Sequence, residues 1–222
     1  MEPYNEIKNL IITGKYEPGK RLTEEELANT LNISRTPIRQ AIHQLQFEGL
    51  VTQLKKGVIV REFTKKDIEQ IYNLRAVLEG YATREAALNR TTEDLTIMQD
   101  ANHEYKTAVK NYITTNSDDL SHIFKSNKKF HDRLLLASKN DYLKFHIDKV
   151  VVLPLVFRSF YWYNEDELYR SYTIHHSIIE AIKNHDFERA NTAICEHIYQ
   201  ARDHVLKHAE EIKSVILKGE GK

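Results

Sequence analysis

The fold of this chain is decided by the stretch from Ser34 to Ala41, which has the sequence Ser-Arg-Thr-Pro-Ile-Arg-Gln-Ala. It predicts the start of a helix, because the hydroxyl of Ser34 or Thr36 can accept from the free N–H groups of a first turn. Arg35 and Arg39 are one turn apart and share a helix face. Two guanidinium groups placed in this way can bind guanine or phosphate, as a DNA-reading helix requires. Two solvated surface arginines are the alternative for this stretch alone.

The residues before this stretch predict a second, shorter helix. Thr23 and Glu26 have the spacing of a capping box, in which a hydroxyl and a carboxylate satisfy first-turn N–H groups reciprocally. Leu27 and Leu31 give the helix an apolar face, and Asn32-Ile33 then turns the chain. Two short helices that meet across a tight turn are typical of a helix-turn-helix.

The residues after this stretch predict a β-hairpin. Gly49 can end the helix in a left-handed cap, and residues 50–54 and 58–60 are rich in β-forming side chains. The tip between them is basic and consists of Lys55, Lys56 and Gly57, where the glycine lets the backbone approach a partner closely. Alone, such a tip is more often a solvated turn. After a helix-turn-helix it indicates the wing of a winged helix, with lysines that contact phosphate or reach a minor groove.

Residues 4–62 resemble the amino-terminal domain of GntR-type bacterial transcription regulators. The resemblance is carried by Ile12–Leu22, Leu27-Ala28, Ser34–Ala41, Leu45 and Glu48–Val51. It implies that the residues at Arg35, Thr36, Arg39 and Gly57 contact the operator. Gln40 stands where glutamate is commoner, beside the contact face, and we expect little consequence. Taken with the helix start and the basic tip, the predicted DNA contacts are Ser34, Arg35, Thr36, Arg39, Lys55, Lys56 and Gly57.

The length and composition of the chain predict a second domain and a cytoplasmic protein. The winged helix uses under a third of the 222 residues, so a larger core must follow. The formal net charge is zero, and DNA affinity must therefore come from local placement of cations and from dimerisation. The single Cys195 excludes an intramolecular disulfide and suits a reducing cytosol. No stretch approaches the ~20 apolar residues of a membrane span, and no signal peptide precedes the first helix.

From Thr64 onward the sequence has sustained helical periodicity and few strand signals. Three capping pairs mark helix starts, namely Thr64 with Asp67, Thr91 with Asp94, and Asn164 with Glu167. We therefore expect a mainly α protein, in which a winged helix-turn-helix (1–63) precedes an antiparallel bundle of about six helices (64–222). The hinge is expected at 61–64. The predicted helices are 65–89, 92–115, 118–138, 141–162, 165–183 and 187–213.

Histidine is the residue type that suggests chemistry in this bundle. Asn127 and His131 share one helix face, and His175 and His197 lie at similar heights on either side of the turn at 184–186. Three imidazoles and one oxygen can therefore converge on a metal such as Zn, Ni, Cu or Fe, with room left for water or an anion. The chain has eleven histidines, so such a trio can also align by chance. Asp118 with His122 is a rival pair at the same spacing.

Residues 65–207 resemble the effector domain, called FCD, of the FadR subfamily of GntR regulators. The resemblance is carried by Arg75, Glu79, Phe130-His131, Leu134, Ala137-Ser138, Asn140, His175, Ile178–Ile182, Asp186, Ala190 and His197-Ile198. Many members bind a divalent metal through an aspartate and three histidines, which fall here on Asn127, His131, His175 and His197. Zn or Ni is the expected metal. Asn127 replaces the usual carboxylate, so the site should bind metal more weakly but favour an incoming carboxylate more.

The sequence thus predicts a cytoplasmic, homodimeric transcription regulator, more often a repressor in this family, that binds an inverted repeat in double-stranded DNA. A small organic acid is the expected effector, with Arg75, Arg158 and Tyr161 as candidate contacts. We do not expect an enzyme. Two alternatives stay open, a metal-dependent hydrolase and a metal-free regulator that responds to an acyl thioester. No carboxylate stands out as a general base for the first, and the three histidines argue against the second.

Overall fold

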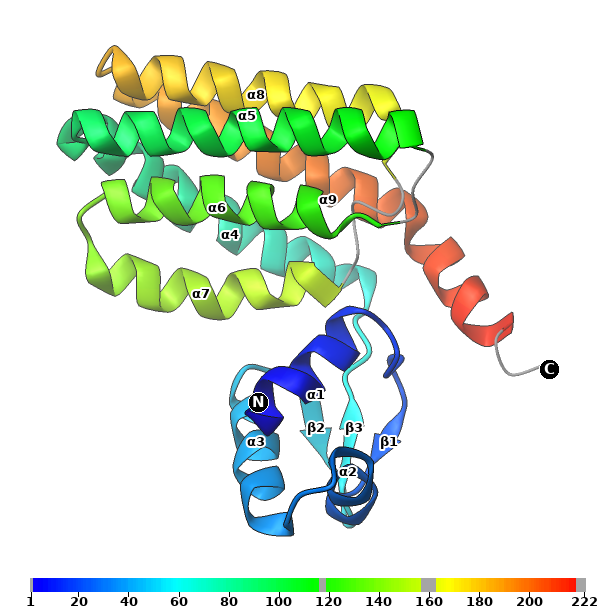
Figure 1. Ribbon diagram of the computed structural model, residues 1–222. Helices are drawn as coiled ribbons and strands as arrows, with labels where there is room; N and C mark the ends of the chain where they lie inside the picture. Colours follow the sequence, from blue (N-terminus) through cyan, green and yellow to red (C-terminus); the bar gives the residue numbers. More distant parts are fainter. Residues whose placement is uncertain (1, 116–118, 157–162, 219–222) are drawn as a thin grey trace.

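The computed structural model describes residues 2–115, 119–156 and 163–218, which form a small winged domain and a larger helical bundle (Figure 1). The predicted fold class is confirmed. The winged domain contains α1 (Pro3–Ile12), β1 (Arg21–Leu22), α2 (Glu24–Leu31), α3 (Arg35–Phe47), β2 (Val51–Gln53) and β3 (Val58–Val60). The bundle contains α4 (Lys65–Asn89), α5 (Thr92–Thr115), α6 (Ser121–Ala137), α7 (Asp141–Val156), α8 (Glu165–Lys183) and α9 (Phe187–Lys218). None of the described helices is long and apolar enough to cross a membrane.

The core of the winged domain forms around one face of α3. The apolar residues of that helix, at helical spacing, are buried against α1 and α2 (Ile38, Ala41, Ile42 and Leu45). The opposite face of α3 leaves Arg35, Arg39 and His43 exposed. Figure 1 shows that α3 begins at the end of the winged domain that lies farthest from the bundle, whereas α1 lies nearest to it. The polar face of α3 is therefore open to a large partner.

The predicted caps of α2 and α3 are only partly correct. The Thr23 hydroxyl accepts from the backbone N–H of Glu26 at 3.1 Å, which is one of the two bonds of the expected capping box. Ser34 occupies the N-cap position of α3, but its side chain makes no capping bond. The prediction for Ser34 was wrong because the third helical residue is Pro37, which lacks the N–H that an N-cap side chain often binds.

The wing contains one strand that the sequence did not predict. The hairpin of β2 and β3 pairs Val51 with Val60, and the short strand β1 pairs with the other edge of β3. A strand of two residues is too short to show an alternating pattern. The Gly57 backbone has a φ of +76°, and a Cβ there would lie 2.4 Å from the Leu22 carbonyl oxygen in β1. Glycine is therefore required at the wing tip both by its dihedral angle and by the close approach of β1.

The helix starts of the bundle largely agree with the capping pattern. The reciprocal bonds of a capping box are present at Thr64 with Asp67 and at Asn164 with Glu167. Thr91 and Asp94 make the same pair of bonds. Helix α6 begins at Ser121, later than the predicted residue 118, and α9 continues to Lys218 rather than 213. The predicted last turns of α7, up to 162, lie outside the described residues.

Helix α4 is the central element of the bundle, packs along α9 and also contacts α6, α7 and α8 (Figure 1). Gly80 permits the close approach of α4 to α9. A Cβ at this position would lie 2.5 Å from Asn191 Oδ1 and 2.7 Å from Cys195 Sγ. Helices α6, α8 and α9 all pack on α4, and their histidines lie in the interior between them.

Candidate metal centre and recognition surface

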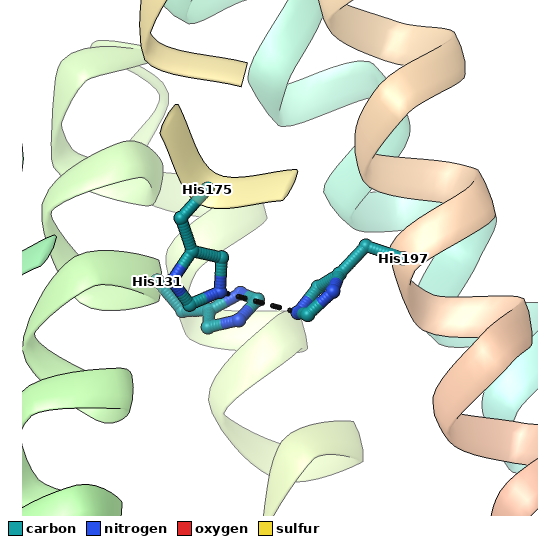
Figure 2. A group of neighbouring side chains, drawn as sticks. All are labelled: His131, His175 and His197. Atoms are coloured by element: carbon teal, nitrogen blue, oxygen red, sulfur yellow. Dashed lines mark hydrogen bonds between the residues drawn. The ribbon is translucent and has the colours of Figure 1, made fainter. Parts of the chain in front are cut away.

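Three histidines from three helices meet in the core of the bundle (Figure 2). His131 comes from α6, His175 from α8 and His197 from α9, and all three are buried. Their ligand nitrogens lie within 4.8 Å of one another, and the Nε2 atoms of His175 and His197 are 3.2 Å apart. The structure thus brings together three of the four residues that were predicted to hold a metal.

Packing holds His175 in its orientation and keeps its ring neutral. Its imidazole stacks on Phe130, with ring centroids 4.0 Å apart, and meets the edge of Tyr105. Burial lowers the pKa of His175 well below its usual value, and the neighbouring imidazoles lower it further. Burial likewise lowers the pKa of His197 to about 3. Both rings are therefore neutral at physiological pH and can offer a nitrogen lone pair to a cation.

A buried carboxylate orients the third imidazole. His131 Nδ1 lies 2.7 Å from Glu79 Oε2, and Glu79 Oε1 accepts from Arg75 Nε at 2.5 Å. Burial alone would raise the pKa of Glu79, but Arg75 and His131 lower it to about 2. An ionised carboxylate at Nδ1 favours the tautomer that has its lone pair on Nε2, as carboxylates bonded to metal-binding histidines do.

Sequence analysis missed this role of Glu79 and placed Arg75 among the effector contacts. The signal that could have revealed it is an oppositely charged pair at i, i+4 within the apolar face of a long helix, where the side chain of Glu79 is 1% exposed. In the structure the guanidinium of Arg75 is engaged by Glu79. The other two predicted effector contacts, Arg158 and Tyr161, lie outside the described residues.

The residues around the triad fit a divalent metal. Among the described residues, Asn127 Oδ1 and His131 Nε2 are buried without a hydrogen-bond partner, which is costly unless a ligand satisfies them. Asn127 lies one turn before His131 on α6. At 3.2 Å, the two Nε2 atoms are close enough for both to lie about 2.1 Å from a shared zinc ion. Three imidazole nitrogens therefore face one another, and an unpartnered amide oxygen lies one turn away on α6.

A small polar cavity adjoins the triad at His197. It has a volume of about 50 Å³ and is lined by Tyr163, Glu167, Arg170, Ser171, His197, Gln200 and His204. His204 Nδ1 lies 3.2 Å from Glu167 Oε1, while its Nε2 is buried and unpartnered within the described part of the chain. The rival residue His122 lies elsewhere, in an open hollow of about 680 Å³ between α5 and α6. Its partner Asp118 is outside the described residues.

The predicted DNA contacts lie on the exposed face of α3 and at the wing tip. Ser34, Arg35, Thr36, Arg39, Lys55 and Lys56 are all exposed. Two of them pair with the first turn of α2. Arg39 donates from Nε and Nη2 to the two carboxylate oxygens of Glu24, at 2.9 and 2.8 Å. Arg35 makes a single contact, with Nη2 3.2 Å from Glu25 Oε2.

Comparison with known proteins assigns both domains. Residues 2–60 match the model of the bacterial regulatory proteins of the gntR family, and residues 70–200 match that of the FCD domain. The uncharacterised HTH-type transcriptional regulator YdhC of Bacillus subtilis is 32% identical over 94% of this chain and 91% of that protein. The gluconate operon transcriptional repressor of Bacillus licheniformis is 37% identical, over 34% of this chain and 31% of that protein. The structure of E. coli McbR/YncC shares the fold, with a TM-score of 0.78 and 24% identity over 93% of this chain and 96% of that one.

Proposed function

The chain belongs to the GntR family of bacterial transcription regulators with an FCD domain, and we propose that a small organic acid controls its affinity for operator DNA. The acid would bind together with a divalent metal in the helical domain. The observation that carries this proposal is the meeting of His131, His175 and His197 inside the bundle. We assign DNA binding to residues 1–63 and sensing to residues 64–222.

The proposed metal ligands are the three imidazoles and Asn127 Oδ1. A set dominated by imidazole nitrogen suits Zn or Ni better than Mg or Ca. A bound divalent cation would supply an electrophilic centre that attracts a carboxylate. Because Asn127 brings no charge, the chain's own ligands leave the positive charge of the metal uncompensated, which favours an anionic effector.

The cavity beside His197 supports a polar effector. Arg170 and Gln200 line it and can donate hydrogen bonds to a carboxylate, and the unpartnered Nε2 of His204 can bond to a hydroxyl. At about 50 Å³ the cavity holds little more than one or two water molecules, so an acid larger than this requires the surrounding helices to move. Arg75, Arg158 and Tyr161 remain proposed contacts for such an acid.

A movement of α6 can reach the DNA-binding domain through α7. Helix α6 carries Asn127 and His131 and is joined to α7 by residues 138–140. Helix α7 packs against α4 and also contacts α1, the first helix of the winged domain (Figure 1). We propose that effector binding shifts α6 and α7 and thereby changes the placement of the winged domain.

An apolar stripe on α4 supports a homodimer. Leu74, Val77, Tyr81 and Leu88 are all exposed, between 48% and 65%, and follow the three- and four-residue spacing of a two-helix seam. We propose that α4 pairs with its copy across a two-fold axis, so that two α3 helices read an inverted repeat. The similarity of 34% of this chain to a gluconate operon repressor supports repression, and we propose that the protein acts on DNA in the cytoplasm.

The hydrogen bonds of Glu79 favour a sensor over a hydrolase. This carboxylate contacts the triad, but it is bound by Arg75 and by His131 Nδ1 and is poorly placed to activate water. We therefore propose that the domain is not an enzyme. Measurable ester or amide hydrolysis by the wild-type protein that is lost in His131→Ala would overturn this part of the proposal.

Three measurements on the full chain test the regulator. Selection from random duplex DNA should enrich an inverted repeat, and elemental analysis of protein purified without added metal should find Zn or Ni. A thermal-shift screen with small carboxylic and sugar acids should then give a compound that stabilises the protein and releases the selected DNA. Absence of divalent metal, together with no stabilisation by Zn or Ni, would refute the metal site.

A further inference from the structure

We propose that Glu24 of α2 is a positioning residue that holds Arg39 ready to read a base and so determines operator specificity. The inference rests on the proposed role of Arg39 in DNA binding. It concerns a carboxylate in the first turn of the neighbouring helix.

The geometry of the pair leaves a defined part of Arg39 free. Glu24 accepts from Nε–H and from one N–H of Nη2, at 2.9 and 2.8 Å. The two N–H groups of Nη1 and the second N–H of Nη2 remain available. One N–H from each of these nitrogens forms the outer edge of the guanidinium, which matches the O6 and N7 acceptors of guanine. Glu24 thus occupies the edge that is not needed for base reading.

The local structure holds Glu24 firmly in this position. It is the first residue of α2, directly after Thr23, whose hydroxyl caps the helix. A carboxylate in this first turn is also favoured by the helix dipole. Thr23 in turn lies next to the wing, because β1 ends at Leu22 and the Gly57 turn packs on the Leu22 carbonyl. The carboxylate is therefore anchored where the recognition helix and the wing come together.

The charge of Glu24 favours a base over a phosphate as the partner of Arg39. Ion pairs at exposed sites contribute little to folding, so the pair is not explained as a source of stability. A carboxylate next to the guanidinium repels a phosphate but not the neutral edge of a base. It also restricts one of the most flexible side chains before DNA arrives, which reduces the entropy lost on binding.

Glu25 and Arg35 provide a matched comparison within the same two helices. Their single contact is 3.2 Å long, and both side chains are more than 60% exposed, whereas the side chain of Glu24 is 32% exposed. Glu25 carries the same charge on the next residue of the same helical turn, but it does not hold its arginine in a two-point contact. Removal of the Glu25 carboxylate should therefore remove the same charge as removal of the Glu24 carboxylate, but it should leave Arg39 in position.

The experiment selects operators from random duplex DNA with full-length wild-type protein and with Glu24→Gln, Glu25→Gln, Arg39→Ala and the Glu24→Gln, Arg39→Ala double variant. Affinities for the best site, for each single-base variant of it and for unrelated DNA are then measured by fluorescence anisotropy at two salt concentrations. Thermal unfolding establishes that each variant is folded.

We expect both glutamine variants to bind unrelated DNA more tightly, because each removes a negative charge from every recognition surface. Only Glu24→Gln should reduce discrimination at one position of each half-site, by about tenfold or more. Arg39→Ala should lose discrimination at the same position, and adding Glu24→Gln to it should cause no further loss. That pattern supports an action of Glu24 through Arg39.

Two results separate failure of this inference from failure of the proposed function. If Arg39→Ala loses base preference while Glu24→Gln behaves like Glu25→Gln, Arg39 reads DNA without help from Glu24 and the inference is overturned. If Arg39→Ala binds every site as the wild type does, the assignment of Arg39 to the operator is itself wrong. A further loss of discrimination in the double variant would show that Glu24 acts independently of Arg39, which also overturns the inference.

Discussion

His175 and His197, on consecutive helices, face each other with their Nε2 atoms 3.2 Å apart in the buried core of the bundle. Two neutral imidazoles in this arrangement either share one proton or bind a common cation. The orphaned oxygen of Asn127 and the orphaned Nε2 of His131 support the cation, because a shared proton between His175 and His197 would leave both of these atoms unsatisfied. The core of the effector domain is therefore best explained as a binding site.

Removal of one imidazole should abolish metal binding. For His175→Ala we expect no metal after purification and no rise in melting temperature with added Zn or Ni, because a nitrogen ligand is lost. In the wild type, metal at a hundredfold excess over Kd should stabilise the fold by about 2.7 kcal/mol. The control is His176→Ala, at the next residue of α8 but exposed. Equal metal content in the two variants would contradict the prediction.

Glu79→Gln should weaken metal binding without removing a ligand. The amide can still accept from His131 Nδ1, but it no longer stabilises the ring electrostatically. Loss of a carboxylate that is hydrogen-bonded to a ligand histidine typically lowers metal affinity by about 10–100-fold. Competition with a coloured chelator measures this directly. Unchanged affinity would mean that Glu79 serves only to neutralise Arg75.

Lys56→Ala should weaken binding to operator and to unrelated DNA by similar factors. The exposed lysine at the wing tip is expected to contact phosphate, so its loss should also reduce the salt dependence. For a dimer that loses two such contacts, the slope of log K against log salt should fall by about 2. Lys66→Ala, an exposed lysine on α4, is the control. A loss confined to one DNA sequence would show instead that the wing reads bases.

Gly80→Ala should destabilise the bundle although alanine is the better helix former. The new methyl group would approach Asn191 Oδ1 to 2.5 Å and Cys195 Sγ to 2.7 Å, so α4 and α9 must separate or both side chains must move. Overpacking of this kind costs about 1–3 kcal/mol, which exceeds the ~1 kcal/mol gained in helix propensity. Urea unfolding measures the difference. Adding Asn191→Ala to Gly80→Ala should restore part of the lost unfolding free energy, because it removes one of the two close contacts. A Gly80→Ala protein that is more stable than wild type would disprove the close contact.

Acid should remove a contribution of Asp94 to stability. Burial alone would raise the pKa of this carboxyl group. The Thr91 N–H and the Lys139 ammonium have the larger, opposite effect and lower the pKa to about 2. Because the pKa is below the ordinary value of 3.8, the stabilisation is fully present above pH 3.8 and is lost as the pH falls toward 2. The difference corresponds to roughly 2 kcal/mol. Asp94→Asn should therefore be less stable than wild type at pH 6, and this gap should narrow at pH 3 in urea titrations.

Local signals in the sequence predicted most helix starts correctly. Thr64 and Asn164 each precede a carboxylate by three residues, and the structure has both capping boxes. Ser34 has the residue type of a cap but makes no capping bond, and Pro37 removes one of the first-turn N–H groups that it could have bound. Strand β1 was not predicted, because its two residues are in a strand only through their pairing with β3. The errors thus occur where a feature depends on a second segment.

The sequence by itself determined that a winged helix precedes a helical bundle, because capping pairs, apolar periodicity and turn residues act over only a few positions. Only the tertiary structure decided which side chains meet. Glu79 contacts His131 across 52 residues, and Glu24 contacts Arg39 across 15. Such contacts depend on how helices pack and on how closely Gly80 lets two of them approach. The spacing of histidines in one sequence suggests a site, but the carboxylate that orients one of them is brought there only by the packing of distant helices.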